Sequence, residues 1–172
     1  IDTGSFSLGM GLQVVAAARE AIAGKSADLI QRTIENLRER TSIIFVLDTL
    51  EWVRRGGRLD RIIPLVDRVA RTLRVKPVLE MCNGEFRLVS IARSSRSALR
   101  GVDCEVRERL PVQGMAEVYT RGCAAAGDLA DRIAGLAGVS RSEVILAEVG
   151  PAFAAHAGPN ALGAAIVRRV KK

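Results

Sequence analysis

Residues 75–93 read VKPVLEMCNGEFRLVSIAR, and this stretch decides what kind of sheet the chain can form. Two runs of alternating apolar and polar residues flank Asn83 and Gly84. Asn-Gly is a preferred pair for a two-residue type I′ turn, because both turn residues need a positive φ. The stretch therefore predicts a β-hairpin, and with it a sheet that contains antiparallel strands.

Helical patterns precede the hairpin. The apolar spacing predicts a helix over residues 7–23, which Gly24 should end. One face of this helix carries Val14, Val15, Ala18 and Ile22. Ser26 is a typical N-cap for a second helix that ends near Arg40.

Strand and helix patterns alternate over the rest of the chain. Apolar runs predict strands near residues 42–49, 116–121, 142–150 and 161–170. Helices are expected over residues 60–73, from Ser94 or Ser95 to about Arg109, and over 128–138. No internal repeat or domain boundary is evident. The pattern indicates a two-layer α/β domain with a mixed, largely antiparallel sheet packed by helices.

The composition narrows the classes of function. Aromatic residues make up only 3% of the 172 residues, which leaves few platforms for stacking bases. The net charge of +7 is compatible with a phosphate-bearing partner, but the arginines are scattered and alternate with acidic residues, so a solvated surface is the favoured interpretation. No apolar run approaches the ~18 residues of a membrane span, and no signal peptide is recognisable. The spacing of Cys82, Cys104 and Cys123 fits no metal site and predicts reduced thiols of a cytoplasmic protein.

Two motifs could hold an anion. Hydroxyls at Thr3, Ser5 and Ser7 precede the first helix, whose free N–H groups could receive a carboxylate or phosphate. Simple N-capping by Ser7 is the competing interpretation. Arg93 and Arg96 stand where the hairpin meets the next helix, and they could contact an anion or only solvent.

Two further motifs are candidates for recognition. Arg54, Arg55 and Arg58 surround a Gly-Gly pair and suit an acidic protein surface or a phosphate, although solvated arginines are equally compatible. His156, the only histidine, stands in HAGPNALG, where it could be functional or structural. No nucleophile elbow, catalytic triad or Walker motif accompanies it.

Taken in order, these motifs resemble the DegV family of bacterial fatty-acid-binding proteins. The resemblance rests on DTGSFSLGMG, LDTLEWVRRGGRLD, VKPVLEMCNGEF, IARSSR and HAGPNALG, which span nearly the whole chain. Thr3 replaces the usual Ser, and Asn160 replaces a Gly in a turn where Asn tolerates a left-handed φ. The resemblance implies that residues 1–172 are the C-terminal lipid-binding domain and that the family's N-terminal α/β domain lies outside this chain.

The resemblance also implies a function. His156 matches a histidine that hydrogen-bonds the lipid carboxylate at the mouth of a buried acyl tunnel. A long-chain fatty acid would be the ligand, with no metal or other cofactor. A separate fatty acid kinase would form the acyl phosphate, so the chain would be a carrier and not an enzyme. Contacts with an anion or the missing domain would come from Thr3, Ser5, Ser7, Arg93 and Arg96, and docking of the kinase from Arg54, Arg55 and Arg58. Candidate tunnel walls are Phe45, Val46, Leu79 and Ile91, although apolar strand residues such as these are core residues by default.

Two other functions stay open from the residues alone. The chain could be an enzyme domain in which His156 acts as a general acid or base on a small phosphorylated substrate. It could also be a basic nucleic-acid-binding module, with an affinity that falls steeply with salt. The scarcity of aromatic residues and the scattered arginines argue against a nucleic-acid-binding module.

Overall fold

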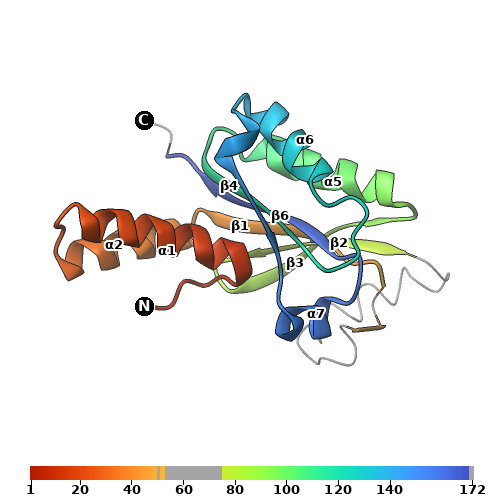
Figure 1. The fold of residues 1–172 in the computed structure, drawn as a ribbon, viewed down its shortest axis with the longest axis horizontal. Helices are drawn as coiled ribbons and strands as arrows, with labels where there is room; N and C mark the ends of the chain where they lie inside the picture. Colours follow the sequence, from red (N-terminus) through yellow and green to blue (C-terminus); the bar gives the residue numbers. More distant parts are fainter. Residues whose placement is uncertain (50, 53–74, 171–172) are drawn as a thin grey trace.

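A computed structural model describes residues 1–49, 51–52 and 75–170 of the protein (Figure 1). The hairpin is formed by β2 (Lys76–Cys82) and β3 (Glu85–Ala92), which pair antiparallel. Asn83 and Gly84 both have positive φ, 49° and 82°, which confirms the type I′ turn.

Six strands form one sheet in the order β3-β2-β1-β6-β4-β5. The central strand β1 (Thr41–Val46) is antiparallel to β2 and to β6 (Leu162–Arg168), and β6 is antiparallel to β4 (Val112–Tyr119). Only the edge strand β5 (Val144–Glu148) pairs in parallel, with β4. A parallel pair needs a crossover, which α6 (Asp128–Ala137) and the short 3₁₀ helix η1 (Arg141–Glu143) provide. The predicted α/β class with a mixed, largely antiparallel sheet is confirmed.

Helices lie on both faces of the sheet (Figure 1). The α5/α6 face is the one on which α5 (Ser95–Glu108) and α6 cover Ile44 and Val46 of β1. The α1/α7 face carries Ile43 and Phe45, and is covered by α1 (Ser7–Ile22) at one end and α7 (Pro151–Ala157) at the other. Helix α2 (Ala27–Arg38) packs along α1. In the described part of the chain, no helix combines the length and apolar character needed to cross a membrane.

The helix boundaries follow the local signals. Ser26 caps α2 by accepting a hydrogen bond from the Leu29 N–H, and Ser94 caps α5 through the Ser97 N–H. Gly24 takes a φ of 74° just beyond α1, as expected of a helix stop. The helix predicted over residues 60–73 lies outside the described residues.

The apolar stripe predicted for α1 faces solvent. Val14 and Ile22 are 55% and 88% exposed, whereas the buried residues of α1 are Gly9 and Gln13. Gly9 lies so close to the sheet that a Cβ there would be 2.8 Å from the Ile43 side chain. Because α1 is apolar nearly all round, its periodicity does not identify the buried face, and the side with the smallest residue packs closest.

Buried charges hold the α5/α6 face together. Arg109 donates to Glu80 at 2.5 Å and to Glu105 at 2.7 Å, and Arg87 bridges the same two carboxylates at 2.7 and 2.9 Å. Burial acts to raise the pKa of Glu80, but hydrogen bonds from Arg87 and the charge of Arg109 outweigh it, so this pKa lies below its ordinary value. The network ties β2 and β3 to α5.

A second buried carboxylate anchors α6. Glu117 of β4 is fully buried and accepts hydrogen bonds from the N–H groups of Gly127, at 2.9 Å, and Ala130, at 2.6 Å. These N–H groups belong to the free N-terminal end of α6, which no side chain of its own caps. Burial raises the pKa of Glu117 above its ordinary value.

Candidate functional site

The four phenylalanines of the chain meet in one cluster on the α1/α7 face. Phe6 stacks on Phe153 with ring centroids 5.2 Å apart and meets Phe45 edge-on at 5.9 Å. Phe86 lies 6.3 Å from Phe45 and 6.1 Å from Phe6. The rings come from β1, β3, α7 and the segment before α1, so the fold collects them from four separate parts of the sequence. Such pairs add about 0.5–1.5 kcal/mol each beyond the area that they bury.

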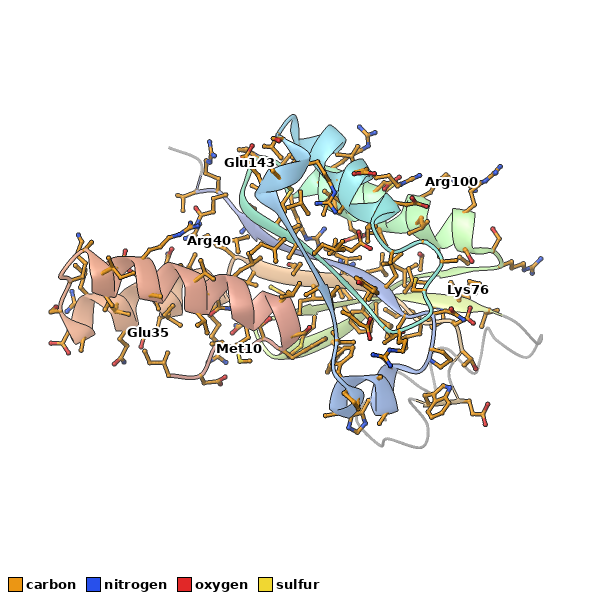
Figure 2. The ribbon with its side chains drawn as sticks, in the orientation of Figure 1. Met10, Glu35, Arg40, Lys76, Arg100 and Glu143 are labelled. Atoms are coloured by element: carbon orange, nitrogen blue, oxygen red, sulfur yellow. The ribbon has the colours of Figure 1, made fainter. Side chains whose placement is uncertain are left out.

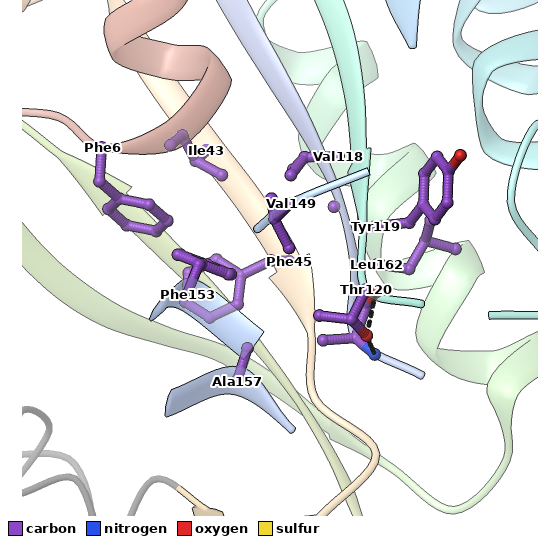
Figure 3. Close-up of a pocket in the computed structure, with 12 residues that line it drawn as sticks. Phe6, Ile43, Phe45, Val118, Tyr119, Thr120, Val149, Phe153, Ala157 and Leu162 are labelled. Carbon is purple, nitrogen blue, oxygen red and sulfur yellow. Dashed lines mark hydrogen bonds between the residues drawn. The ribbon is translucent and has the colours of Figure 1, made fainter. Parts of the chain in front are cut away.

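A small pocket lies beside three of these rings, those of Phe6, Phe45 and Phe153 (Figure 3). Its lining surface is apolar and no charged side chain contributes to it in the described structure. The lining residues are Phe6, Ile43, Phe45, Val118, Tyr119, Thr120, Val149, Phe153, Ala157, Ala161, Leu162 and Gly163. The cavity volume is only about 10 Å³, about enough for one water molecule. A larger apolar ligand could enter only if one or more rings moved.

Backbone and small residues set the floor of this pocket. Gly163 of β6 faces Phe45, and a Cβ at this glycine would lie 2.7 Å from the Phe45 Cβ and 2.9 Å from the Ile44 carbonyl oxygen. Ile44 and Phe45 belong to the central strand β1, which is paired on both sides, so neither can move aside without disrupting the sheet. Glycine is therefore required where β6 passes the phenylalanine cluster.

Helix α7 carries the histidine and one of the rings. This seven-residue helix was not predicted from the sequence, although Pro151 after Gly150 is a common helix start. His156 lies in its last turn and is exposed, and it has neither an ion pair nor a hydrogen bond with any residue that the structure describes. Phe153, one turn earlier, lines the pocket. The helix therefore places an imidazole at the surface beside an apolar interior.

The turn that follows α7 is held from both sides. Gly158 has a φ of 75°, and the Trp52 indole occupies the space that a Cβ would need there. Asn160 takes a φ of 57°, as expected for this substitution, and its Nδ2 donates to Asp48 at 3.3 Å. Asp48 also pairs with Lys76 of β2. The residues that follow His156 are thus fixed to the ends of β1 and β2.

The hydroxyls near the N-terminus are engaged only in part. Thr3 Oγ1 donates to the Ser5 carbonyl at 3.3 Å, and the Ser5 hydroxyl is buried without a partner in the described structure. N-capping by Ser7 is wrong, because Phe6 holds the N-cap position and Ser7 is the first helical residue. Contact of these hydroxyls with an anion stays a prediction.

The predicted arginines do not gather at His156. Arg93 and Arg96 are exposed where β3 leads into α5, whereas His156 lies on the α1/α7 face. Arg54, Arg55 and Arg58 lie outside the described residues.

A second, larger cavity of about 370 Å³ opens on the α5/α6 face. It is lined by Val46, Asp48, Lys76, Ser95, Leu99, Cys123, Ala124, Ala125, Asp128, Asn160 and Leu162. Val46, a candidate tunnel wall, faces this cavity, whereas Leu79 and Ile91 pack with the phenylalanine cluster. Burial raises the pKa of the Cys123 thiol, which disfavours the thiolate. The described side chains offer no group of three His, Cys, Asp or Glu residues that could hold a metal ion.

Comparison with known proteins gives consistent matches. Residues 1–169 match the model of a family described as "Uncharacterised protein, DegV family". A DegV domain-containing protein of Streptomyces coelicolor is 31% identical over 98% of this chain and 59% of its own length. One from Deinococcus radiodurans is 31% identical over 96% of the chain and 58% of its own length. The chain thus spans about three fifths of these curated relatives.

Solved structures share the fold. A structure described as fatty acid binding of a DegV family protein from Thermus thermophilus has a TM-score of 0.84 at 24% identity, over 98% of this chain and 60% of that one. A DegV family protein from Eubacterium eligens, loaded with heptadecanoic acid, has a TM-score of 0.85 at 16% identity, with the same shares covered.

Proposed function

Because this chain belongs to the DegV family, we propose that it binds a long-chain fatty acid, with the acyl chain on the α1/α7 face of the sheet. The phenylalanine-lined pocket beside His156 carries this proposal. A structural neighbour from Thermus thermophilus, described as fatty acid binding, and one from Eubacterium eligens, loaded with heptadecanoic acid, support it.

The apolar lining suits an acyl chain. Each buried methylene contributes about 0.8 kcal/mol, so a long chain could gain on the order of 10 kcal/mol before the costs of binding. The pocket has room for about one water, so Phe6 and Phe153 would have to give way. Phe153 belongs to a helix of seven residues, and Phe6 to the segment before α1. Both rings thus come from short elements and not from the central strands, which makes them the candidates to move.

His156 is the proposed partner of the fatty acid carboxylate. A carboxylate needs hydrogen-bond donors where the chain leaves water, and the imidazole has no other partner in the described structure. Its place one turn beyond Phe153 would put it where an acyl chain emerges. Thr3, Ser5 and Ser7 remain candidates for further contacts with the carboxylate or with another domain.

The carrier role is also proposed. The chain would hold the fatty acid while a separate kinase phosphorylates the carboxylate, and the catalytic groups would belong to that kinase. Arg54, Arg55 and Arg58 are the proposed docking residues for it.

Organic extraction and mass spectrometry of the purified protein test fatty acid binding. We expect about one fatty acid per chain, and less in the variant Phe153→Trp, which adds bulk to the pocket. Leu99→Trp adds bulk beside the other cavity and should leave the fatty acid in place, while circular dichroism checks that both variants fold. His156→Gln should reduce retention without emptying the pocket.

The Thermus thermophilus protein, extracted in parallel, shows that the procedure recovers bound lipid. An empty chain beside a loaded control would contradict the proposal for these 172 residues. Equal retention in Phe153→Trp and Leu99→Trp would move the ligand away from the phenylalanine cluster.

A further inference from the structure

Two side-chain atoms in the described part of the chain are buried without a hydrogen-bond partner, and both lie near the start of α1. They are the hydroxyl oxygen of Ser5, Oγ, and the amide oxygen of Gln13, Oε1. Gln13 as a whole is fully buried. Buried polar atoms are nearly always hydrogen-bonded, because a polar group that leaves water without a new partner costs free energy. Two such atoms so close in the chain indicate a place for a polar group from a ligand.

The two atoms lie on the side of α1 that faces the sheet. Gly9 and Gln13 are the buried residues of α1 and are one turn apart, whereas Met10 is exposed at the edge of the helix (Figure 2). The Ser5 Oγ lies against Gly9, 2.3 Å from the place that a Cβ would take there. The Gln13 amide reaches back along the helix, since its Nε2 donates to the Thr3 carbonyl at 3.0 Å. Both atoms thus flank the segment that precedes α1.

This segment is held in place, so the two atoms are preorganised. Asp2 pairs with Arg38 at 3.0 Å and accepts a hydrogen bond from the Gly4 N–H at 2.9 Å. The Gly4 carbonyl in turn accepts from the N–H of Gly84 in the hairpin turn at 2.7 Å. The orientation of the Gln13 amide is also fixed, because exchanging its two atoms would set an oxygen against the carbonyl that it now binds.

The two atoms adjoin the α1 end of the phenylalanine-lined pocket. The Cβ position of Gly9, beside the Ser5 Oγ, is also 2.8 Å from the Ile43 side chain. Ile43 and Phe6, which follows Ser5, both line the pocket, and Figure 3 shows them on its α1 side, with Ala157 of α7 at the opposite end. An acyl chain that enters beside α7 would therefore approach the two atoms with its middle or far part, and not with its carboxylate.

The chemistry of the two atoms suits a neutral hydroxyl group. The Gln13 Oε1 only accepts hydrogen bonds, whereas the Ser5 hydroxyl can donate and accept. A carboxylate would oppose Oε1 with a second acceptor and leave it unpartnered. An ammonium group would be buried without a counter-charge, because the nearby Asp2 and Arg38 pair with each other. A hydroxyl can donate to Gln13 and accept from Ser5, so it satisfies both atoms at once.

We infer that Ser5 and Gln13 bind a hydroxyl group of the acyl chain, so that the protein prefers a fatty acid hydroxylated in its middle or far part over the plain acid of equal length. The inference rests on the proposed binding of a fatty acid on the α1/α7 face. It gives Ser5 a partner on the acyl chain in place of the carboxylate. A buried water has the same hydrogen-bonding chemistry, and with a water in this place the two acids would bind alike.

The test is displacement of a fluorescent fatty acid from the delipidated protein by three competing acids. These are octadecanoic acid, 12-hydroxyoctadecanoic acid and 3-hydroxyoctadecanoic acid, the last of which carries its hydroxyl close to the carboxylate. Each acid is titrated into wild type, Ser5→Ala and Gln13→Met, with Ser90→Ala as the matched control. Ser90 is a half-buried residue of β3 whose Oγ lies 3.1 Å from the Cβ position of Gly101 of α5, so its hydroxyl is on the other face of the sheet.

We expect wild type and Ser90→Ala to bind the 12-hydroxy acid roughly tenfold or more tightly than octadecanoic acid, and the 3-hydroxy acid no more tightly than octadecanoic acid. Ser5→Ala should reduce this preference below about threefold, and its urea midpoint should not fall, because the hydroxyl that it removes has no partner in the described structure. Gln13→Met should reduce the preference as well, but it also loses the bond to Thr3, so Ser5→Ala is the decisive variant.

Two results would overturn the inference alone. They are equal binding of the 12-hydroxy acid and octadecanoic acid by wild type, which would identify water as the source of the hydroxyl, and a tenfold preference that survives in Ser5→Ala. Failure of all three acids to displace the fluorescent fatty acid would overturn the proposed function, and the inference with it. The two failures are therefore distinguishable.

Discussion

The two faces of the sheet are stabilised in different ways. The α1/α7 face gathers the four phenylalanines in one cluster, and three of them line a void of about 10 Å³ to which no described charged side chain contributes. The α5/α6 face buries Glu80, Glu105 and Glu117 and keeps a cavity of about 370 Å³. Apolar packing has no fixed partners and can rearrange around an apolar guest, whereas a buried charge loses much when its partner moves. The contrast explains why the tighter of the two cavities is the better candidate for a lipid.

The largest effect should come from unpairing the charges of the α5/α6 face. Arg109→Met leaves Glu80 and Glu105 with Arg87 alone, whose side chain is 54% exposed. Removing one partner of a buried ion pair costs about 3–5 kcal/mol. The control is Arg121→Met, which breaks an exposed pair with Glu148 worth about 0–1 kcal/mol. Urea unfolding measures the free energy of unfolding of both variants. Similar losses would show that the network stabilises the fold no more than an exposed ion pair does.

A smaller loss is expected on the α1/α7 face. Phe153→Ala removes a half-buried ring, so the free energy of unfolding should fall by about 2 kcal/mol, below the 3–5 kcal/mol of a fully buried phenylalanine. The variant should take up a fluorescent fatty acid faster than wild type, because the pocket is already open. A loss of stability as large as that of Arg109→Met, or uptake slower than in wild type, would contradict the idea that the apolar packing of this face rearranges at a small energetic cost.

The smallest effect concerns pH and has opposite signs at two carboxylates of the α5/α6 face. The pKa of Glu80 is lowered in the folded protein. Its contribution to the free energy of unfolding is therefore present above the ordinary pKa of 4.5 and is lost as pH falls through the folded pKa. The pKa of Glu117 is raised, so its contribution is present below 4.5 and is lost as pH rises through the folded pKa.

Unfolding free energies of wild type, Glu80→Gln and Glu117→Gln between about pH 3 and pH 8 measure these contributions. Relative to wild type, Glu117→Gln should gain stability as pH rises above 4.5, and Glu80→Gln should gain as pH falls below it. Parallel pH profiles in the two variants would contradict the assignment.

Local signals predicted most of the fold. Asn83 and Gly84 fix the hairpin through their own φ angles, and Ser26 and Ser94 each cap the helix that follows by accepting a hydrogen bond from the N–H group three residues on. Such features depend on a few neighbouring residues and can be recognised in a single sequence.

The candidate site depends on contacts between distant segments. Phe6 and Phe153 are 147 positions apart, and nothing near either residue indicates that their rings stack. The buried side of α1 could not be predicted from periodicity, because the close packing of Gly9 on Ile43 is a contact between distant segments. The motif around His156 made this part of the chain a candidate from the sequence alone, but the helix that carries it, α7, was not predicted.

The contact of Trp52 with Gly158 has an experimental consequence. Trp52 is the only tryptophan, and its indole covers the glycine two positions after His156. Indole emission shifts with the polarity of its surroundings, and the four phenylalanines and single tyrosine do not interfere when tryptophan is excited selectively. The protein therefore carries an intrinsic fluorophore beside its candidate binding site, and titrations of this turn need no attached dye.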